Sequence, residues 1–352
     1  MPPRSRSTKP PTLLIRADAN VSIGTGHVMR CFALAEAWQD AGGAVAFLAG
    51  EMPKRLESRL NSDNMGVSGI DAVPGSKEDA AATIARADRL NADWIAVDGD
   101  RFGSNFLNSL RAARGRTLLL DDFAARESFP ADIIVNPNLG AEAKLYKSRP
   151  GGSQAEILTG PRYVLLRSEF SRPIERAFPE NGNRVLITLG GSDPENLAPR
   201  IAGALAKRPD FELTVVAGPG YPTASELQKI SSDDSKVIVD PQNMAELMAD
   251  ADLAVIAAGG TLWELLASEC VVLSYARNPV QSRVIETLAR EGIAVDMGAT
   301  SRFDPVRLVS EVKRLASSKT AREKMASRGR ALIDGNGAVR VIAAMRDREA
   351  QR

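Results

Sequence analysis

The sequence predicts an α/β protein built from two Rossmann-like, doubly wound domains that face each other across a cleft. Its 352 residues exceed what one ordinary hydrophobic core holds, which indicates two domains. In each half, short apolar runs without polar alternation are followed by helical stretches, a pattern typical of a parallel sheet covered on both faces. A segment rich in proline, glycine and charge at 171–184 separates the halves and predicts the linker.

The first half predicts an N-terminal domain over 12–170. The sequence predicts helices from His27 to Ala41, over 77–90 and near 104–113. The polar, proline-rich segment 1–11 has no apolar stretch of signal-peptide type, and we expect a disordered leader there. Apolar runs of strand type lie at 12–18, 44–49, near 67–70, 94–98, 117–122 and 131–138.

The second half predicts a C-terminal domain over 185–335, followed by a C-terminal helix at 336–352. Amphipathic helices fill 304–352, and further helices fall between the strands. In doubly wound sheets, ligands bind beyond the carboxyl ends of the strands, so the loops that follow the strands are the candidate sites. Strands are predicted at 184–190, 213–218, 236–240, 253–259, 271–276 and 293–298.

The composition argues against several classes of function. A formal net charge of +1 provides no basic field for nucleic acid, and no apolar run approaches the roughly 18–20 residues of a membrane helix. Cys31 and Cys270 lie far apart in apolar segments, which favours buried free thiols in a reducing cytoplasm over a disulfide. One histidine and two distant cysteines argue against zinc, so we expect no metal and no cofactor, and we expect a monomer.

The only histidine of the chain, His27, follows a glycine-containing loop at the predicted start of a helix. This G-x-G-H is not a dinucleotide fingerprint, because Met29 stands where the third glycine would be needed. A helix N-terminus disfavours imidazolium, so we expect a neutral ring that can accept a proton at pH 7. Such a ring suits a general base, whereas a capping or packing histidine is the alternative. Its uniqueness and its place at a cleft edge favour function.

Two charged residues flank His27 in the sequence, and two further strand ends carry carboxylates. Asp18, at the end of the first strand, could orient the imidazole, bind a substrate hydroxyl or cap the following loop. Arg30 could reach a diphosphate or lie on the helix surface. Two further strand ends carry aspartate pairs that could bind sugar hydroxyls, hold phosphate through a metal, or cap loops: Asp98 with Asp100, and Asp121 with Asp122.

The second half carries two glycine turns at strand ends, Gly190-Gly191 and Gly259-Gly260. The first leads through Ser192 and Asp193, a candidate N-cap, to a helix predicted from Pro194, and the second leads to a helix at Thr261. Exposed amides at a helix start can hold phosphate, although β–α turns also use glycine for steric reasons alone. Glu264 lies one turn into the second helix, where it could hold a ribose or remain a solvated first-turn glutamate.

Several motifs together resemble those of the UDP-sugar hydrolases of pseudaminic acid biosynthesis, which remove UDP from UDP-2,4-diacetamido-2,4,6-trideoxy-β-L-altropyranose. The family is related to the GT-B glycosyltransferases. The matching motifs run in the family's order from about residue 12 to 298. They are IRADANVSIGTGHVMRC, LLLDDF, VNPN, LTGPRYVLLRSEF, LGGSDPEN and AGGTLWEL.

The resemblance implies a fold of two Rossmann-like domains, with UDP on the C-terminal one and the sugar near the N-terminal G-x-G-H. His27 would be the catalytic residue that activates water for attack on the anomeric carbon with inversion, without a metal. Amides of Gly190–Asp193 and Gly259–Thr261 would hold the diphosphate, and Glu264 the ribose. The loop at 240–247, with Met244 beside the base, would bind uracil.

Two departures from the family concern the sugar. Hydrolases of the family commonly have tyrosine soon after the strand-end aspartate, where this chain has Asp98-Gly99-Asp100. They tend to carry Asn-Gln where this chain has Asn278-Pro279, so the partner amide is lost or shifted to Gln281. UDP binding would be unaffected and the sugar identity open. The substrate-binding candidates are Asp18, Gly24, Gly26, Arg30, Asp98, Asp100 and Asn278.

The leading hypothesis is therefore a hydrolase of a UDP-linked diacetamido-trideoxy sugar. Its alternatives are a GT-B-like glycosyltransferase with a UDP-sugar donor and a nucleotide-sugar binding protein without catalysis. A dehydrogenase is disfavoured, because neither half has the dinucleotide glycine spacing after its first strand.

Overall fold

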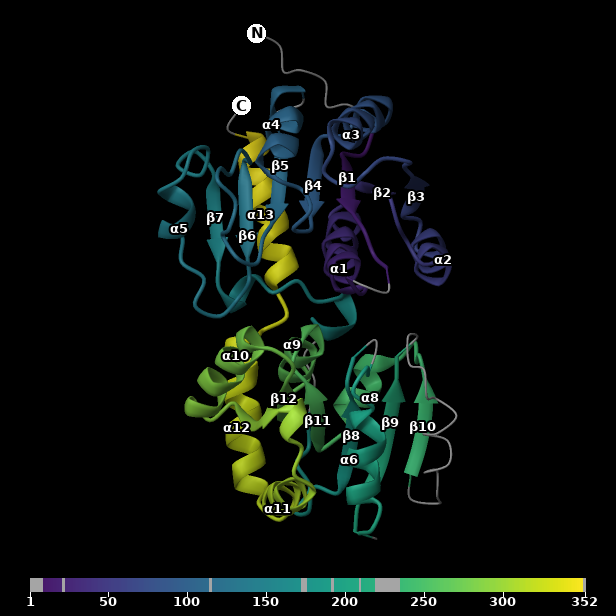
Figure 1. Cartoon of the computed structure of the whole chain (residues 1–352), viewed down its shortest axis with the longest axis vertical. Coiled ribbons are helices and arrows are strands. Elements are labelled where there is room, and N and C mark those ends of the chain that lie inside the picture. Colours follow the sequence, from purple (N-terminus) through teal and green to yellow (C-terminus); the bar gives the residue numbers. More distant parts are fainter. Residues whose placement is uncertain are drawn as a thin grey trace. The chain divides into compact units, whose positions relative to one another are not determined.

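The structure is a computed structural model that describes residues 9–20, 23–113, 116–171, 176–190, 193–208, 210–218 and 235–350. The chain forms two compact units (Figure 1). The first comprises Met1–Ser168 together with Gly335–Arg352, and the second comprises Glu169–Asp334. Each unit holds one parallel sheet with helices between its strands, so the predicted α/β fold class is confirmed.

The first unit contains a seven-stranded parallel sheet in the order β3-β2-β1-β4-β5-β6-β7. The edge strand β7 is missing from the sequence prediction, because its four residues are only partly buried and lack a continuous apolar run. The strands are β1 (Thr12–Ala17), β2 (Ala44–Ala49), β3 (Gly66–Gly69), β4 (Trp94–Asp98), β5 (Thr117–Leu120), β6 (Ile133–Asn136) and β7 (Glu156–Thr159).

Helices cover both faces of this sheet, as its buried central strands require. Buried side chains of α1 and α13 share one core cluster with β1, and those of α3 and α4 share another with the opposite face. The helices are α1 (Gly26–Asp40), α2 (Lys54–Ser62), α3 (Lys77–Leu90), α4 (Ser104–Ala113), α5 (Lys144–Lys147) and α13 (Gly337–Ala350).

The C-terminal helix α13 belongs to the core of the first unit, although the second unit precedes it in the chain (Figure 1). Met345 is fully buried there, and Trp94 Nε1 on β4 donates to Glu349 Oε1 at 2.8 Å. At Gly337, a Cβ atom would lie 2.1 Å from the carbonyl oxygen of Val164, so the helix start packs directly on backbone. The sequence alone had set this helix apart as an element of its own.

The second unit contains a six-stranded parallel sheet in the order β10-β9-β8-β11-β12-β13. Its strands are β8 (Arg184–Thr188), β9 (Glu212–Ala217), β10 (Ser235–Val239), β11 (Leu253–Ala257), β12 (Val271–Ala276) and β13 (Ala294–Ala299). Its helices are α6 (Leu197–Leu205), α8 (Met244–Asp250), α9 (Gly260–Ala267), α10 (Pro279–Arg290), α11 (Pro305–Ala316) and α12 (Lys319–Leu332).

Both sheets reverse their strand order once, and these reversals position the candidate sites. In the first unit the reversal lies between β1 and β4, and in the second it lies between β8 and β11. Loops leave the two central strands in opposite directions at such a point, which opens a crevice at their carboxyl ends. Asp18 and Asp98 lie at the first crevice, and Gly190 and Gly259 lie at the second.

Packing of α13 on the first unit can be tested with one buried and one exposed side chain of the same helix. We expect Met345→Ala to lower the free energy of unfolding by about 2–5 kcal/mol, because it leaves a cavity in the core. Val339→Ala is the matched control, since Val339 is 59% exposed. This substitution should change the free energy of unfolding by no more than about 0.5 kcal/mol. Urea denaturation of both variants measures the difference, and equal effects would contradict this packing.

Candidate active site

His27 lies at the first crevice as the second residue of α1. The loop before it turns sharply, because Gly24 adopts a left-handed φ of 74° and its amide donates to the Asn20 carbonyl at 2.8 Å. His27 Nδ1 lies 2.8 Å from Oδ1 of Asp98, the last residue of β4. The His27 side chain remains 23% exposed, whereas that of Asp98 is fully buried. The crevice therefore contains a histidine–aspartate dyad with an accessible ring.

The charge on Asp98 determines how the dyad is protonated. Burial raises the pKa of Asp98, but Arg30 and His27 outweigh it and lower that pKa to about 2. Asp98 is thus an acceptor at neutral pH, and its bond to His27 requires the proton on Nδ1. Nε2 is then the nitrogen that can exchange a proton with a bound molecule, as in other carboxylate–histidine pairs.

The expectation from the helix start, that its field lowers the pKa of His27 and keeps the ring neutral at pH 7, is wrong in direction. The hydrogen bond to Asp98 raises the pKa of His27, and burial and Arg30 oppose this only in part. The adjacent full charge outweighs the partial charges of the helix terminus. The ring is consequently a stronger base than a free histidine, and it is neutral only above a raised pKa.

Arg30 connects two carboxylates. It donates to Asp98 through Nε at 2.6 Å and Nη2 at 2.5 Å, and to Asp122 through Nη1 at 2.8 Å and Nη2 at 2.9 Å. Its side chain is 20% exposed, so the alternative of a solvated arginine on the helix surface is wrong. Arg30 fixes Asp98 beside the ring, since its Nη2 shares Oδ1 with His27 Nδ1 and lies 3.3 Å from that nitrogen. The contact of Arg30 with a substrate stays a prediction.

Asp18 is held away from the dyad. Its Oδ1 accepts from Arg16 Nη1 at 2.6 Å and from the Gly50 amide at 2.7 Å, while Arg16 also pairs with Asp79 at 2.9 Å. Among the contacts described here, Asp98 orients the imidazole, which was one alternative for Asp18. Oδ2 of Asp18 is buried and has no hydrogen-bond partner within the part of the chain that the structure describes. Its contact with a substrate hydroxyl stays a prediction.

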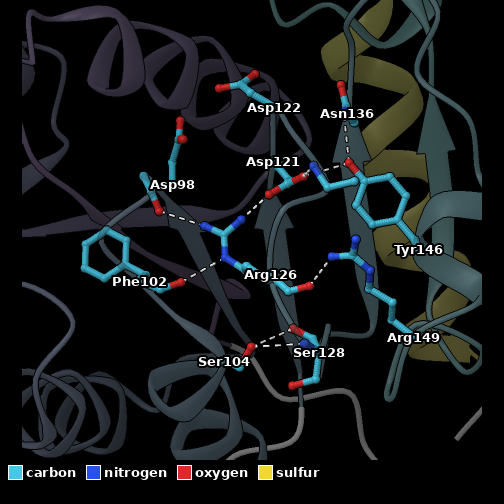
Figure 2. A network of polar contacts seen from close by, with 12 residues as sticks. Asp98, Phe102, Ser104, Asp121, Asp122, Arg126, Ser128, Asn136, Tyr146 and Arg149 are labelled. Carbon is cyan, nitrogen blue, oxygen red and sulfur yellow. Dashed lines mark hydrogen bonds and ion pairs between the residues drawn. The ribbon is translucent and has the colours of Figure 1, made fainter.

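A second tier of buried polar groups lies at the carboxyl ends of β5 and β6, where Figure 2 shows Asp121, Arg126 and Tyr146 side by side. Asp121 pairs with Arg126 and accepts from Tyr146 Oη at 2.7 Å. Asn136, the last residue of β6, donates to the same Oη at 2.7 Å. Burial and Asp121 raise the pKa of Tyr146, so it stays a protonated donor. Sequence reasoning found the aspartates but missed Arg126, Tyr146 and Asn136.

The remaining candidates of the first unit lie at the rim. Asp100 is exposed, and burial of part of its surface and the neighbouring Asp122 raise its pKa. Asp122 accepts from Asn138 Nδ2 at 3.1 Å. Gly24 and Gly26 are both exposed on the loop that leads to His27. The structure thus brings this part of the predicted set to one crevice, and their contacts with a substrate stay predictions.

At the second crevice, Gly190 adopts a left-handed φ of 89° directly after β8, and α9 begins at Gly260 after β11. Its N-cap Gly259 provides no side-chain hydrogen bond, and a Cβ on Gly259 or Gly260 would meet no heavy atom within 4 Å. The start of α9 is therefore exposed at Gly259 and Gly260, next to a half-buried Thr261. The predicted contacts of Gly191 and Ser192 lie outside the described residues.

The helix predicted from Pro194 begins instead at Leu197, with Asn196 as its N-cap residue. Asp193 still binds this helix start, because its Oδ2 accepts from the Ala198 amide at 2.8 Å. Two residues, Glu195 and Asn196, separate the proline from the helix, and Asn196 adopts a left-handed conformation with φ of 49°. Asp193 is buried, and its predicted contact with UDP stays a prediction.

Asn278 caps a helix in this structure. Its Oδ1 accepts from the Gln281 amide at 3.0 Å, and Gln281 Oε1 accepts from the Arg277 amide at 2.8 Å, so the two side chains close the start of α10. Arg277 Nη2 reaches across to the Leu189 carbonyl at 2.8 Å, beside the Gly190 turn. Sequence reasoning missed this arginine, because only its position relative to another strand end brings it to the crevice.

Glu264 and Met244 are half-buried residues of the second unit. Glu264 lies in α9, and Met244 is the first residue of α8. Their predicted contacts with ribose and uracil stay predictions, as does the sugar contact of Asn278. Over the described residues, no group of three or more metal-binding side chains could hold a metal ion, and none of the helices is long and apolar enough to cross a membrane.

Three relatives of known sequence resemble the chain, whereas no family model matches it. An uncharacterized protein of Methanocaldococcus jannaschii is 27% identical over 76% of this chain and 56% of its own length. The spore coat polysaccharide biosynthesis protein SpsG of Bacillus subtilis is 30% identical over 62% and 65%. The UDP-2,4-diacetamido-2,4,6-trideoxy-β-L-altropyranose hydrolase of Campylobacter jejuni is 24% identical over 81% and 98%. The chain thus spans less than two thirds of the first two relatives.

Solved structures decide the fold. MurG of Acinetobacter baumannii superposes with a TM-score of 0.66 and 17% identity over 96% of this chain and 100% of its own. The chain has the GT-B fold. Arabidopsis thaliana UGT89C1, solved with UDP-L-rhamnose, has a TM-score of 0.63 and 14% identity over 96% and 100%. Together with the three relatives, these similarities confirm the resemblance to the hydrolase family and to GT-B proteins.

The dyad can be tested through the only imidazole of the chain. We expect the pKa of His27 to lie above 6.5 in the folded protein, and Asp98→Asn to lower it, because the substitution removes the adjacent anion. Asp40→Asn is the matched control, since Asp40 is an exposed aspartate at the other end of the same helix. NMR titration of the ring measures all three proteins. A pKa below 6.5 in the unaltered protein, or no response to Asp98→Asn, would contradict the dyad.

Proposed function

We propose that the chain is a hydrolase that releases UDP from a UDP-linked diacetamido-trideoxy sugar by His27-assisted attack of water on the anomeric carbon with inversion. The observation that carries this proposal is the dyad of His27 and Asp98 at the first crevice, with Nδ1 bound at 2.8 Å. Nε2 takes a proton from water as the oxygen attacks the anomeric carbon, and the bond from that carbon to the UDP oxygen breaks. Asp98 keeps the ring oriented and stabilises the imidazolium that forms.

The charges of the two crevices support different halves of the substrate. The four carboxylates of Asp98, Asp100, Asp121 and Asp122 outnumber the cations of Arg30 and Arg126 at the first crevice even when His27 is protonated. Such a site repels a diphosphate but stabilises the positive charge that develops on the sugar ring as its C–O bond breaks. The second crevice has uncapped amides and Arg277, which suit a diphosphate. We assign the sugar to the first unit and UDP to the second on this basis.

The comparisons support a UDP-sugar as the class of substrate. The C. jejuni relative, matched over 98% of its length, has the printed name of a hydrolase of this class of UDP-sugar. Structures of the same fold have been solved with UDP-L-rhamnose, with UDP and with dTDP. A second candidate function, glycosyl transfer from a UDP-sugar to an acceptor hydroxyl, is favoured by the glycosyltransferases among these structures. Release of free sugar and UDP from the UDP-sugar alone distinguishes hydrolysis from transfer, which requires an acceptor.

Loss of the base tests catalysis apart from binding. We expect His27→Ala to lower kcat by about 10²–10⁴-fold, because water must then attack the anomeric carbon without a general base to accept its proton. UDP affinity, measured by calorimetry, should change little, since the diphosphate is assigned to the other unit. Glu286→Gln is the control for the effect of a substitution as such, since Glu286 is exposed on α10. A variant that retains full turnover, or an unaltered protein that binds UDP without any turnover, would exclude this mechanism.

The pH dependence follows from the raised pKa of His27. Only the neutral ring accepts a proton, so kcat should be low at acid pH and rise as the pH passes upward through that pKa. Asp98→Asn should move this rise to lower pH while lowering the maximum rate, because the ring loses both its anion and its orientation. Initial rates of UDP release across pH 5–9 provide the profile. A rate that falls over the same range as the ring becomes neutral would exclude the base role.

A further inference from the structure

The turn after β4 carries two of the candidate carboxylates. Asp98 precedes Gly99 and Asp100 follows it, and Gly99 adopts a φ of 135° that side chains rarely allow. A Cβ on Gly99 would also lie 3.1 Å from the ring of Phe102, which closes the same turn. Neither the dyad nor Arg30 contacts the backbone of Gly99 or Phe102 in the contacts described. The position of Asp100 therefore depends on whatever fixes these two residues.

Arg126 fixes them from the loop between β5 and β6 (Figure 2). Its Nη2 donates to the Gly99 carbonyl at 2.8 Å and its Nε donates to the Phe102 carbonyl at 2.9 Å. Its Nη1 pairs with Asp121, and the side chain is 9% exposed. One guanidinium thus binds three acceptors on two loops at the carboxyl edge of the sheet.

The loop that carries Arg126 is itself held in place. Asp121 accepts from Tyr146 Oη and from the Ala124 amide, both at 2.7 Å. The carbonyl of Arg126 accepts from Arg149, and Ser104 Oγ bridges the backbone of Ser128 at 3.1 Å (Figure 2). These contacts hold the backbone of Arg126 in place, so its side chain can fix the position of the turn that carries Asp100.

Packing holds the opposite side of the turn. The ring of Phe102 is 1% exposed and lies 4.7 Å from the guanidinium carbon of Arg16, the residue that binds Asp18 and Asp79. The turn is thus enclosed between Arg16 on β1 and Arg126 after β5. Asp100 is the exposed end of this arrangement, and no hydrogen bond to its carboxylate is found within the described residues.

The turn that Arg126 holds also lies next to the imidazole. Asp98, two residues before Asp100 in this turn, has its Oδ1 2.8 Å from His27 Nδ1. Partial burial, Asp122 and Asp121 raise the pKa of Asp100, and Arg126 and His27 oppose them, in agreement with this placement.

We infer that Arg126 is a positioning residue that holds Asp100 beside His27 by binding the backbone carbonyls of the turn on which Asp100 lies. For its catalytic consequence, the inference rests on the proposed function. Lysine cannot replace arginine here, because one ammonium group lacks the planar fork that reaches acceptors in two directions. Arg126→Lys consequently keeps the charge and removes the geometry.

A double-mutant cycle that measures the pKa of His27 tests the coupling between Arg126 and Asp100 without any substrate. Asp100→Asn removes an anion and should lower the pKa of His27 measured by NMR titration. In the Arg126→Lys background, we expect the same substitution to lower it by about half as much or less, because Asp100 is no longer held near the ring. Equal shifts in the two backgrounds would overturn the inference.

Arg116→Lys is the matched control, since Arg116 lies in the same unit, pairs with Glu349 and does not contact the loop of Arg126 in the contacts described. In its background, the shift caused by Asp100→Asn should remain full. Thermal unfolding verifies that each variant is folded at the titration temperature, and Arg126→Gln replaces Arg126→Lys in the cycle if the lysine variant does not fold. A reduced shift in the Arg116→Lys background would also overturn the inference, because an arginine substitution remote from the turn would then suffice.

Activity measurements separate this inference from the proposed function. If UDP-sugar is hydrolysed, Arg126→Lys should lower kcat/KM by about tenfold, and by much less once Asp100 is asparagine. If no hydrolysis occurs while the titration cycle shows coupling, the proposed function fails and the positioning role stands. If hydrolysis occurs and the titration cycle shows no coupling, the positioning role fails alone.

Discussion

The candidate site depends on one buried anion, the carboxylate of Asp98 at the end of a central strand. A charge removed from water is costly unless other charges and hydrogen bonds replace its hydration. Here Arg30 binds both oxygens and His27 binds one, which lowers the pKa of Asp98 to about 2 in spite of its burial. The compensation requires α1 to begin at the crevice, so that its second and fifth residues, His27 and Arg30, both reach Asp98 at the end of β4.

Much of the fold could be predicted because parallel strands are buried on both faces and leave continuous apolar runs in the sequence. The same property located the strand-end aspartates and the glycine turns, since the carboxyl ends of such strands gather at one edge. The edge strand β7 and the return of α13 to the first unit left no such signal, because they depend on contacts between distant segments.

The partners of the site residues could not be predicted for a similar reason. Asp98 lies 71 positions after His27, and only the adjacency of β1 and β4 brings the two together. Arg126 binds backbone carbonyls, which every residue possesses and which therefore mark no position in a sequence. The predicted direction of the His27 pKa shift is wrong because the helix start is visible in the sequence, whereas the carboxylate that outweighs it is not.

The raised pKa of His27 has a chemical consequence for the two crevices. A ring bound to an anion is more basic, and it gives up part of its neutral population at pH 7 in exchange for stronger proton acceptance during the reaction. The carboxylates that raise this pKa, Asp98 before Asp122, also repel phosphate. The proposed function therefore assigns the diphosphate to the helix amides and Arg277 of the second unit, which contains no described histidine. In this proposal, the electrostatics of each crevice explain why the base and the anion site lie on different units.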